Sequence, residues 1–233
     1  MKTQSTIDLT KVHPIKTMVT GAQMQSIIDK GAHLVTRKYD GQLAAIEIGN
    51  AVILAEFMGA QISGRHYTDE DREMFSRQET GWYAAITVAE FNSKDVLNES
   101  TSARWQLLHA VAMLFPPNVI LPDIVPDVDK CLAAGAEGVV AMAWNDPWGA
   151  MACVKLYWEG VVRVSLFNGG AQSVFIEDAE TGSARGKINL HSRCDRVRIG
   201  SLLKIRGLSL TDNGKVREPR LDDDSPTSWL VKY

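Results

Sequence analysis

The chain has 233 residues, 45% of them hydrophobic and 23% charged, with a formal net charge of −3. These values are typical of an ordinary globular protein with one large domain or two small ones. Three well-separated cysteines and five isolated histidines offer neither a disulfide framework nor zinc-ligand spacing. The first ten residues are polar and charged, and no apolar run approaches the length of a membrane span. We therefore expect a cytoplasmic protein without a signal peptide.

Helices and strands are mixed in the chain before residue 158. Thr68 is a candidate helix cap, and Pro116 and Pro117 end the longest helix. The predicted elements are an extended lead-in at 7–19, helices at 21–30, 69–76, 100–115 and 127–134, and strands at 32–36, 43–48, 51–57, 82–91, 119–121, 138–143 and 150–157. Because they do not follow a regular βαβ period, we predict an α+β domain over residues 1–158.

After residue 158 the pattern changes to short strands with almost no helix. Clusters of glycine, asparagine and aspartate separate these strands. The predicted strands cover residues 161–167, 173–177, 187–190, 201–210 and 229–233. Such a pattern predicts an all-β barrel or sandwich over residues 159–233.

A hexapeptide at residues 36–41, Thr-Arg-Lys-Tyr-Asp-Gly, follows one of the predicted strands. In an extended chain Lys38 and Asp40 share a face, and Gly41 then releases the chain into a turn. A lysine beside a carboxylate can serve as a covalent nucleophile if burial or nearby cations lower its pKa. Taken alone, Lys-x-Asp-Gly also fits a surface ion pair that precedes a hairpin.

Further candidate groups follow Lys38 in order along the chain. Glu56 and Phe91 end two predicted strands, Glu137 begins another within Glu-Gly-Val-Val, and Lys155 lies in the last strand before the domain boundary. This ordered set resembles the motifs of the covalent nucleotidyltransferases, which include ATP-dependent DNA ligases, RNA ligases and mRNA capping enzymes. The nearest resemblance is to the small ATP-dependent DNA ligases of phages and viruses.

The resemblance covers nearly the whole chain, from about residue 16 to residue 220. It implies an adenylation (nucleotidyltransferase) domain at 1–158 followed by an OB-fold barrel at 159–233. It also implies an enzyme that seals nicks in duplex DNA through a lysyl-adenylate and a DNA-adenylate. ATP is expected rather than NAD, because the length leaves no room for the extra domain of NAD-dependent ligases. We expect a monomer in the cytoplasm, that of a host cell if the chain is phage-encoded.

The same resemblance assigns the phosphate chemistry to four side chains. Lys38, in its motif with Asp40, would attack the α-phosphate of ATP and release pyrophosphate. Lys155 would neutralise the charge that develops on that phosphate. Glu137 would help to bind Mg²⁺, a hard cation suited to carboxylate and phosphate oxygens.

Recognition of the nucleoside is assigned to a second group of residues. The backbone around Thr36 would read the edge of the adenine, and Phe91 would stack on its ring. Glu56 would hold a ribose hydroxyl. Glu90 is an alternative for the ribose contact, although it precedes the phenylalanine assigned to stacking.

Some phosphate-binding positions of the family carry other residues here. Leu43 stands where an arginine often follows the motif glycine, and Tyr157 replaces the second lysine of the usual Lys-x-Lys. The C-terminal Arg-x-Asp-Lys of the family corresponds at best to residues 229–232, Trp-Leu-Val-Lys. These replacements fall mainly on groups that contact phosphates.

Residues 185–220 hold ten basic and three acidic residues, which give a local net charge of +7. One interpretation is a face that binds a polyanion, and the other is a set of strand faces whose charges are offset by acids nearby in space. Under the resemblance this segment would grip the backbone of the duplex without reading its sequence. The predicted contacts are Lys204, Arg206, Arg217 and Arg220.

Two other functions remain compatible with the sequence. An RNA ligase or a guanylyltransferase of the same superfamily would share nearly all of these residues. A catalytically degenerate protein that binds nucleic acid would keep the fold, and the replaced phosphate-binding residues favour it. The retained Lys38, Glu137 and Lys155 favour an enzyme.

Overall fold

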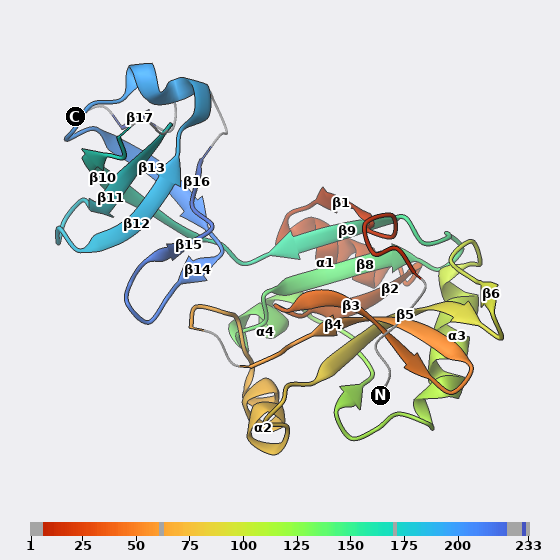
Figure 1. Cartoon of the computed structure of the whole chain (residues 1–233). Helices are drawn as coiled ribbons and strands as arrows, with labels where there is room; N and C mark the ends of the chain where they lie inside the picture. The colour runs from red at the N-terminus through yellow and green to blue at the C-terminus, as the bar shows by residue number, and fades with distance from the viewer. Residues whose placement is uncertain (1–6, 61–62, 170–171, 223–229, 232–233) are drawn as a thin grey trace. The chain divides into compact units, whose positions relative to one another are not determined.

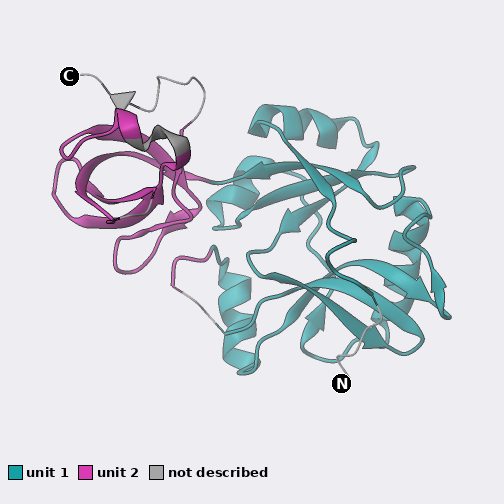
Figure 2. Ribbon diagram, turned by 45° about the horizontal axis from the view of Figure 1, so that its top comes forward, with its two compact units in different colours: residues 1–61, 66–156 teal, residues 62–65, 157–233 magenta. Residues whose placement is uncertain are grey.

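The structure is a computed structural model, and it describes residues 7–60, 63–169, 172–222 and 230–231. The chain divides into two compact units (Figures 1 and 2). Unit 1 comprises residues 1–61 and 66–156, and unit 2 comprises residues 62–65 and 157–233. The sequence places a boundary between residues 158 and 159 but gives no sign that residues 62–65 group with the second unit. Strands predominate in both units.

A four-stranded sheet forms one half of unit 1 (Figure 1). Its strands, in order across the sheet, are β1 (Ile15–Met18), β9 (Ala150–Lys155), β8 (Gly138–Ala143) and β2 (His33–Lys38). β1 runs parallel to β9, and the other neighbours are antiparallel. Helices α1 (Gly21–Asp29) and α4 (Val128–Ala133) pack on one face, where Met24 and Val128 join a core with Val35, Val139 and Val154. The opposite face of this sheet carries Lys38.

A second sheet forms the other half of unit 1. It contains β3 (Gln42–Ile48), β4 (Ala51–Phe57), β5 (Tyr83–Phe91) and β6 (Lys94–Asp95), with β7 (Val119–Ile120) parallel to β5. Helix α3 (Thr101–Ala112) packs on one face, where Leu108 and Val111 meet Ile53 and Val88 in a fully apolar cluster. Helix α2 (Asp69–Arg77) contributes Phe75 to a separate aromatic cluster around Trp82.

Local sequence signals account for the helices of unit 1. Thr20 and Thr68 each begin a helix with a capping box, and Ser100 accepts a hydrogen bond from the Ala103 amide at the start of α3. These side chains satisfy amides that the first helical turn leaves without partners. The four predicted helices are therefore confirmed to within a few residues.

Unit 2 is built around one antiparallel sheet that curls into a barrel-like ring (Figure 2). The sheet order is β12 (Ala184–Asn189), β11 (Ser173–Asp178), β10 (Trp158–Phe167), β13 (Leu202–Gly207) and β16 (Arg220–Leu221), and β17 (Leu230–Val231) pairs with β13. β14 (Ser209–Leu210) and β15 (Val216–Arg217) form a separate hairpin. Alternating residues such as Val162, Val164, Leu203 and Ile205 fill the core.

Residues 63–64 contact this hairpin. The hydroxyl of Ser63 accepts a hydrogen bond from the Asp212 amide at 2.7 Å. The carbonyl of Gly64 accepts hydrogen bonds from the Ser209 hydroxyl and from Arg217. These contacts explain why a segment from the first half of the sequence groups with unit 2.

The predicted strands are also confirmed in type and approximate position, although the short strands β6, β15 and β16 were not predicted. Unit 2 differs from the prediction in three further ways. The strand predicted at 201–210 is broken between β13 and β14. A 3-10 helix at His191–Arg196 was not predicted. Of the strand predicted at 229–233, Trp229, Lys232 and Tyr233 lie outside the described residues. No helix in the described part of the chain is long and apolar enough to cross a membrane.

Candidate active site

Three predicted residues meet at one end of the four-stranded sheet. Lys38 ends β2, Glu137 immediately precedes β8, and Lys155 ends β9. The strand register sets Lys38 opposite Gly138, and Gly138 opposite Lys155. The Glu137 carboxylate accepts a hydrogen bond from Lys38 Nζ through Oε2 at 2.5 Å and forms an ion pair with Lys155 Nζ through Oε1 at 2.8 Å. One buried carboxylate therefore holds both amines.

The charge of Lys38 is set by its carboxylate neighbours. Burial would lower the pKa of Lys38, but the charges of Glu137 and Glu56 outweigh burial and raise that pKa above its ordinary value. Only 13% of the Lys38 side chain is exposed. In the unliganded protein the amine is thus protonated at neutral pH, and it needs a change in its surroundings before it can act as a nucleophile.

Glu56 approaches this group from the second sheet. Its Oε1 accepts a hydrogen bond from the Gly41 amide at 3.2 Å. Burial raises the pKa of Glu56 above its ordinary value, with repulsion from Glu137 adding to the shift and Lys38 opposing it. The charge of Glu56 therefore interacts with those of Lys38 and Glu137.

At two motif glycines the backbone of a neighbouring strand comes too close for any side chain to fit. A Cβ atom at Gly41 would lie 2.4 Å from the carbonyl oxygen of Phe57, and one at Gly138 would lie 2.1 Å from the carbonyl oxygen of Val154. Both contacts are far shorter than van der Waals distance. The glycines of Lys-x-Asp-Gly and Glu-Gly-Val-Val therefore let neighbouring strands bring the charged side chains together.

Thr36 and Asp40 have different surroundings. Thr36 is buried two residues before Lys38 on the same face of β2, opposite Val140. Asp40 is also buried, but its Oδ2 accepts a hydrogen bond from the His66 amide at 3.0 Å. Asp40 thus supports the loop before α2, whereas Thr36 lines the Lys38 face.

Phe91 and Glu90 are not brought to this group. Phe91 pairs with Ala51 at one end of the β4–β5 pair, whereas Glu56 lies near the other end. The Phe91 ring packs against the core beneath α3. Glu90 pairs with Val52 near the same end. The predicted stacking of Phe91 on adenine does not fit this position. Of the two candidate carboxylates, Glu56 is the one beside Lys38.

Lys16 was not singled out in the sequence, yet it belongs to the group. It lies on β1, an edge strand within the segment predicted only as an extended lead-in. Burial of part of its side chain, with repulsion from Lys38 and Lys155, lowers the pKa of Lys16. No local pattern marks this lysine, because its position follows from the pairing of β1 with β9.

The four basic residues predicted to bind DNA all have partners within unit 2. Lys204 forms an ion pair with Asp222 at 2.6 Å. Arg206 lies over the Tyr157 ring at 5.4 Å, Arg217 donates to the Gly64 carbonyl, and Arg220 lies 3.9 Å from Glu218. Carboxylates thus neighbour two of these four cations, and the other two contact an aromatic ring and a backbone carbonyl.

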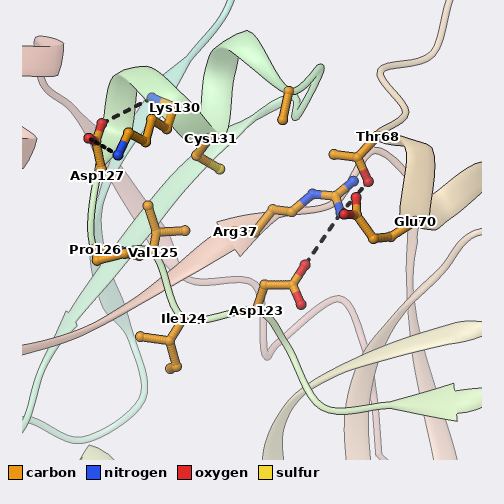
Figure 3. A pocket seen from close by; sticks show the side chains of 11 residues that line it. Arg37, Thr68, Glu70, Asp123, Ile124, Val125, Pro126, Asp127, Lys130 and Cys131 are labelled. Carbon is orange, nitrogen blue, oxygen red and sulfur yellow. Dashed lines mark hydrogen bonds and ion pairs between the residues drawn. The ribbon is translucent and has the colours of Figure 1, made fainter.

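A cavity of about 330 Å³ lies on the other face of β2 (Figure 3). Arg37, Thr68 and Asp123 line it, together with Cys131 of α4. Because neighbouring residues of a strand point to opposite faces, this cavity is separated by the sheet from the amine of Lys38. It is therefore not part of the group around Glu137.

The carboxylates around Lys38 could bind a magnesium ion only if the substrate supplied further oxygen ligands. Among the described residues, no cluster of three or more histidine, cysteine, aspartate or glutamate side chains could hold a metal ion alone. Mg²⁺ commonly binds one or two carboxylates and completes its shell with phosphate oxygens and water. Glu137 and Glu56, which are electrostatically coupled, supply such a pair of carboxylates.

The solved structures that this chain resembles are those of DNA ligases. No protein-family model and no curated protein matches the chain. The likeness therefore rests on the fold.

A structure from a study of Lig E DNA ligases and DNA binding with a minimal scaffold has a TM-score of 0.61 and 16% identity, over 82% of this chain and 91% of that one. The ligase domain of LigD from M. tuberculosis has a TM-score of 0.51 and 12% identity, over 97% of this chain and 100% of that one. A mycobacterial DNA ligase D complexed with ATP and MES has a TM-score of 0.52 and 13% identity, over the same shares. The predicted resemblance to DNA ligases is thus confirmed for the fold.

Proposed function

We propose that this chain is an ATP-dependent DNA ligase, with an adenylation domain at residues 1–158 and an OB-fold barrel at residues 159–233. The observation that carries the proposal is the shared carboxylate of Glu137, which holds Lys38 and Lys155 at hydrogen-bonding distance. Three motifs that are far apart in the sequence supply these groups. The fold around them is shared with DNA ligases.

The first step is self-adenylation. The neutral amine of Lys38 attacks the α-phosphorus of ATP, a nitrogen–phosphorus bond forms, and the bond to the β-phosphate oxygen breaks to release pyrophosphate. Lys155 lies on the other side of Glu137 and stabilises negative charge on the α-phosphate. Glu137 is the nearest base to the proton that Lys38 has to lose. Thr36 lines the same face, where the adenine would lie.

Glu137 and Glu56 would hold Mg²⁺ together with the phosphates of the nucleotide, although Glu56 is also the candidate for the ribose. The bound cation would screen phosphate charge and offset the charge of Glu137. Because Glu137 raises the pKa of Lys38, any loss of that negative charge lowers the pKa of the amine. The carboxylate thus keeps Lys38 protonated until substrate binds.

Two further steps complete the reaction. A 5′-phosphate oxygen at a nick attacks the phosphorus of the lysyl-adenylate, and the bond to Lys38 breaks. The 3′-hydroxyl of the neighbouring strand then attacks the 5′-phosphorus, AMP leaves, and a phosphodiester bond forms. Partly exposed basic groups of the barrel would contact the duplex backbone, with Lys204 and Arg206 as the first candidates.

The test is transfer of label from α-labelled ATP to the purified protein in the presence of magnesium, after removal of any bound AMP. Wild type should acquire covalent label that stays with the denatured protein, and the folded, labelled protein should pass it to nicked duplex DNA. Lys38→Ala should acquire none, because it lacks the nucleophile. Glu90→Ala is a matched control, since Glu90 lies at the far end of the β4–β5 pair, and it should label normally.

The other outcomes separate the competing functions. Label from GTP alone would identify a guanylyltransferase, and transfer only to nicked RNA would identify an RNA ligase. Wild type that takes label from neither nucleotide would be a binding protein without this chemistry. Labelling of Lys38→Ala by ATP would show that another residue is the nucleophile.

A further inference from the structure

The group around Glu137 contains more positive charge than the predicted residues account for. Lys16, Lys38 and Lys155 face two carboxylates, those of Glu56 and Glu137. The remaining titratable neighbour, the Cys153 thiol, is kept neutral because burial raises its pKa. A site with excess positive charge attracts an anion, and the third lysine is the unexplained member.

The strand register places Lys16 on the face that carries Lys38. Lys16 pairs with Met151 in parallel β1–β9, and Met151 packs against Cys153 and Val140 on that face. Val19, at the alternate position, packs on the opposite face against the core of α1 and α4. Alternation along the strand therefore directs the Lys16 side chain to the Lys38 face.

The order of strands places the three lysines in sequence across the sheet. Lys38 comes from β2, Lys155 from β9 and Lys16 from the edge strand β1, with β8 between the first two. Lys16 thus comes from the strand beyond β9, level with Met151, which is four residues before Lys155. Lys16 is exposed at the edge of the sheet, and its flexible side chain can reach an anion bound there.

We propose that Lys16 binds the β- and γ-phosphates of the nucleotide and stabilises the departing pyrophosphate. This inference rests on the proposed function. Attack in line requires the leaving group to lie on the side of the α-phosphorus away from Lys38. With Lys155 beside the α-phosphate, the adjoining edge strand supplies Lys16, whose long side chain would extend along the sheet to the leaving group.

The position of Lys16 would compensate for groups that the chain lacks. Leu43 and Tyr157 stand where the family that this chain resembles has cationic residues. Of the C-terminal segment aligned with its Arg-x-Asp-Lys, Lys232 lies outside the described residues. Lys16 would supply one positive charge to the pyrophosphate group from the N-terminal part of the chain, in place of the C-terminal motif.

The test compares Lys16→Met with wild type in three assays. These are the ATP concentration for half-maximal self-adenylation, the pyrophosphate concentration that removes AMP from the adenylated protein, and sealing of a nick that already carries AMP. A hydrogen bond to a charged group contributes enough affinity to raise the first two concentrations by about tenfold to a hundredfold. Sealing of the pre-adenylated nick should be unchanged, and Lys16→Arg should restore most of the loss.

Lys11→Met is the matched control. Lys11 is five residues away, is 81% exposed and pairs with Asp8, so its substitution should leave all three assays unchanged. Equal slowing of self-adenylation and nick sealing by Lys16→Met would point to a structural role and overturn the inference. So would unchanged ATP and pyrophosphate dependence.

Calorimetric titration of unadenylated protein with inorganic pyrophosphate separates this inference from the proposed function. If wild type takes no label but binds pyrophosphate more tightly than Lys16→Met does, the ligase proposal fails and the anion-binding role of Lys16 stands. If both proteins bind pyrophosphate equally, the role assigned to Lys16 is wrong even where wild type is labelled.

Discussion

Arg37 and Lys38 are consecutive residues of β2 that carry the same charge to opposite faces of one sheet. Arg37 is buried and Lys38 is largely so, with 4% and 13% of their side chains exposed, and both are paired with a buried carboxylate. Arg37 pairs with Asp71 and also donates to the Thr68 hydroxyl. Lys38 shares Glu137 with Lys155. Burial and ion pairing therefore do not by themselves distinguish a structural cation from a reactive one.

The difference lies in what else each carboxylate does. Asp71 accepts a hydrogen bond from the Thr68 amide at 2.9 Å and completes the capping box of α2, so its pair with Arg37 ties this helix to β2. Glu137 instead holds two amines, one on each carboxylate oxygen, and it keeps one cation if the other is removed. A shared carboxylate can exchange partners when a ligand binds, whereas a fully engaged one cannot do so without loss of stability.

The largest expected effect is on stability, and it comes from the Arg37 side. Arg37→Met leaves Asp71 buried without its cation, which should lower the free energy of unfolding by about 3–5 kcal/mol. For a chain of this size that corresponds to about 2–4 °C in melting temperature for each kcal/mol. Lys38→Met should cost less, below about 2 kcal/mol, because Lys155 remains beside Glu137.

Thermal or urea unfolding of the two variants at neutral pH measures this contrast. Each variant controls for the other, because both remove one buried cation from the same strand. Equal losses would contradict the distinction drawn between the two faces. The expected effects on self-adenylation are the reverse. Lys38→Met should abolish it, whereas Arg37→Met should retain it under conditions in which the variant is folded.

Unit 2 extends the same comparison to exposed charges. Lys204 is paired with Asp222, yet 44% of its side chain is exposed, and Arg206 rests on the Tyr157 ring. Reversing both charges to glutamate should weaken binding to nicked duplex DNA by about tenfold or more and make the salt dependence shallower by up to about two units of slope. Self-adenylation should be spared, because it needs only the nucleotide.

Arg163→Glu is the control for this prediction. Arg163 lies on β10 of the same unit, is 41% exposed and is paired with Glu177, so it matches Lys204 in exposure and pairing. An equal loss of DNA binding from this substitution would show a general effect of charge rather than a defined contact surface. Loss of self-adenylation in the double variant would also count against the proposed role of the barrel.

Much of the fold could be predicted because its signals are local. Thr20, Thr68 and Ser100 cap helices as their residue types favour, and Gly49 takes a positive φ in the turn between β3 and β4. The order of Lys38, Glu137 and Lys155 along the chain could likewise be read, through the resemblance. Their convergence depends on a register between distant strands, which no local pattern encodes.

The positions that sequence reasoning misplaced depend on non-local geometry. Two bulges interrupt the β4–β5 pairing, at Val52/Ile53 and Leu54/Ala55, so alternation along β5 does not predict which face Phe91 occupies. The local charge of residues 185–220 also depends on neighbours from outside that segment. Asp178 and Asp222, both outside that segment, pair with Arg185 and Lys204.

The smallest expected effect concerns Glu56 and the pH dependence of stability. Burial raises the pKa of Glu56 in the folded protein above its value in the unfolded chain. Between those two pKa values the folded state binds more protons than the unfolded state does, so stability falls as pH rises through this interval. Above the folded pKa the full cost of the buried charge is present.

Glu56→Gln removes this cost, and its Oε1 can still accept the hydrogen bond from the Gly41 amide. We expect the variant to match wild type at low pH, where both side chains are neutral, and to exceed it near pH 7 by about 0.5–1 kcal/mol. Thermal unfolding of wild type and variant at a series of pH values measures the difference. If Glu56 also contacts the nucleotide, the stabilised variant should require more ATP for self-adenylation. A gain in stability that did not change with pH would mean that the charge of Glu56 is not its source.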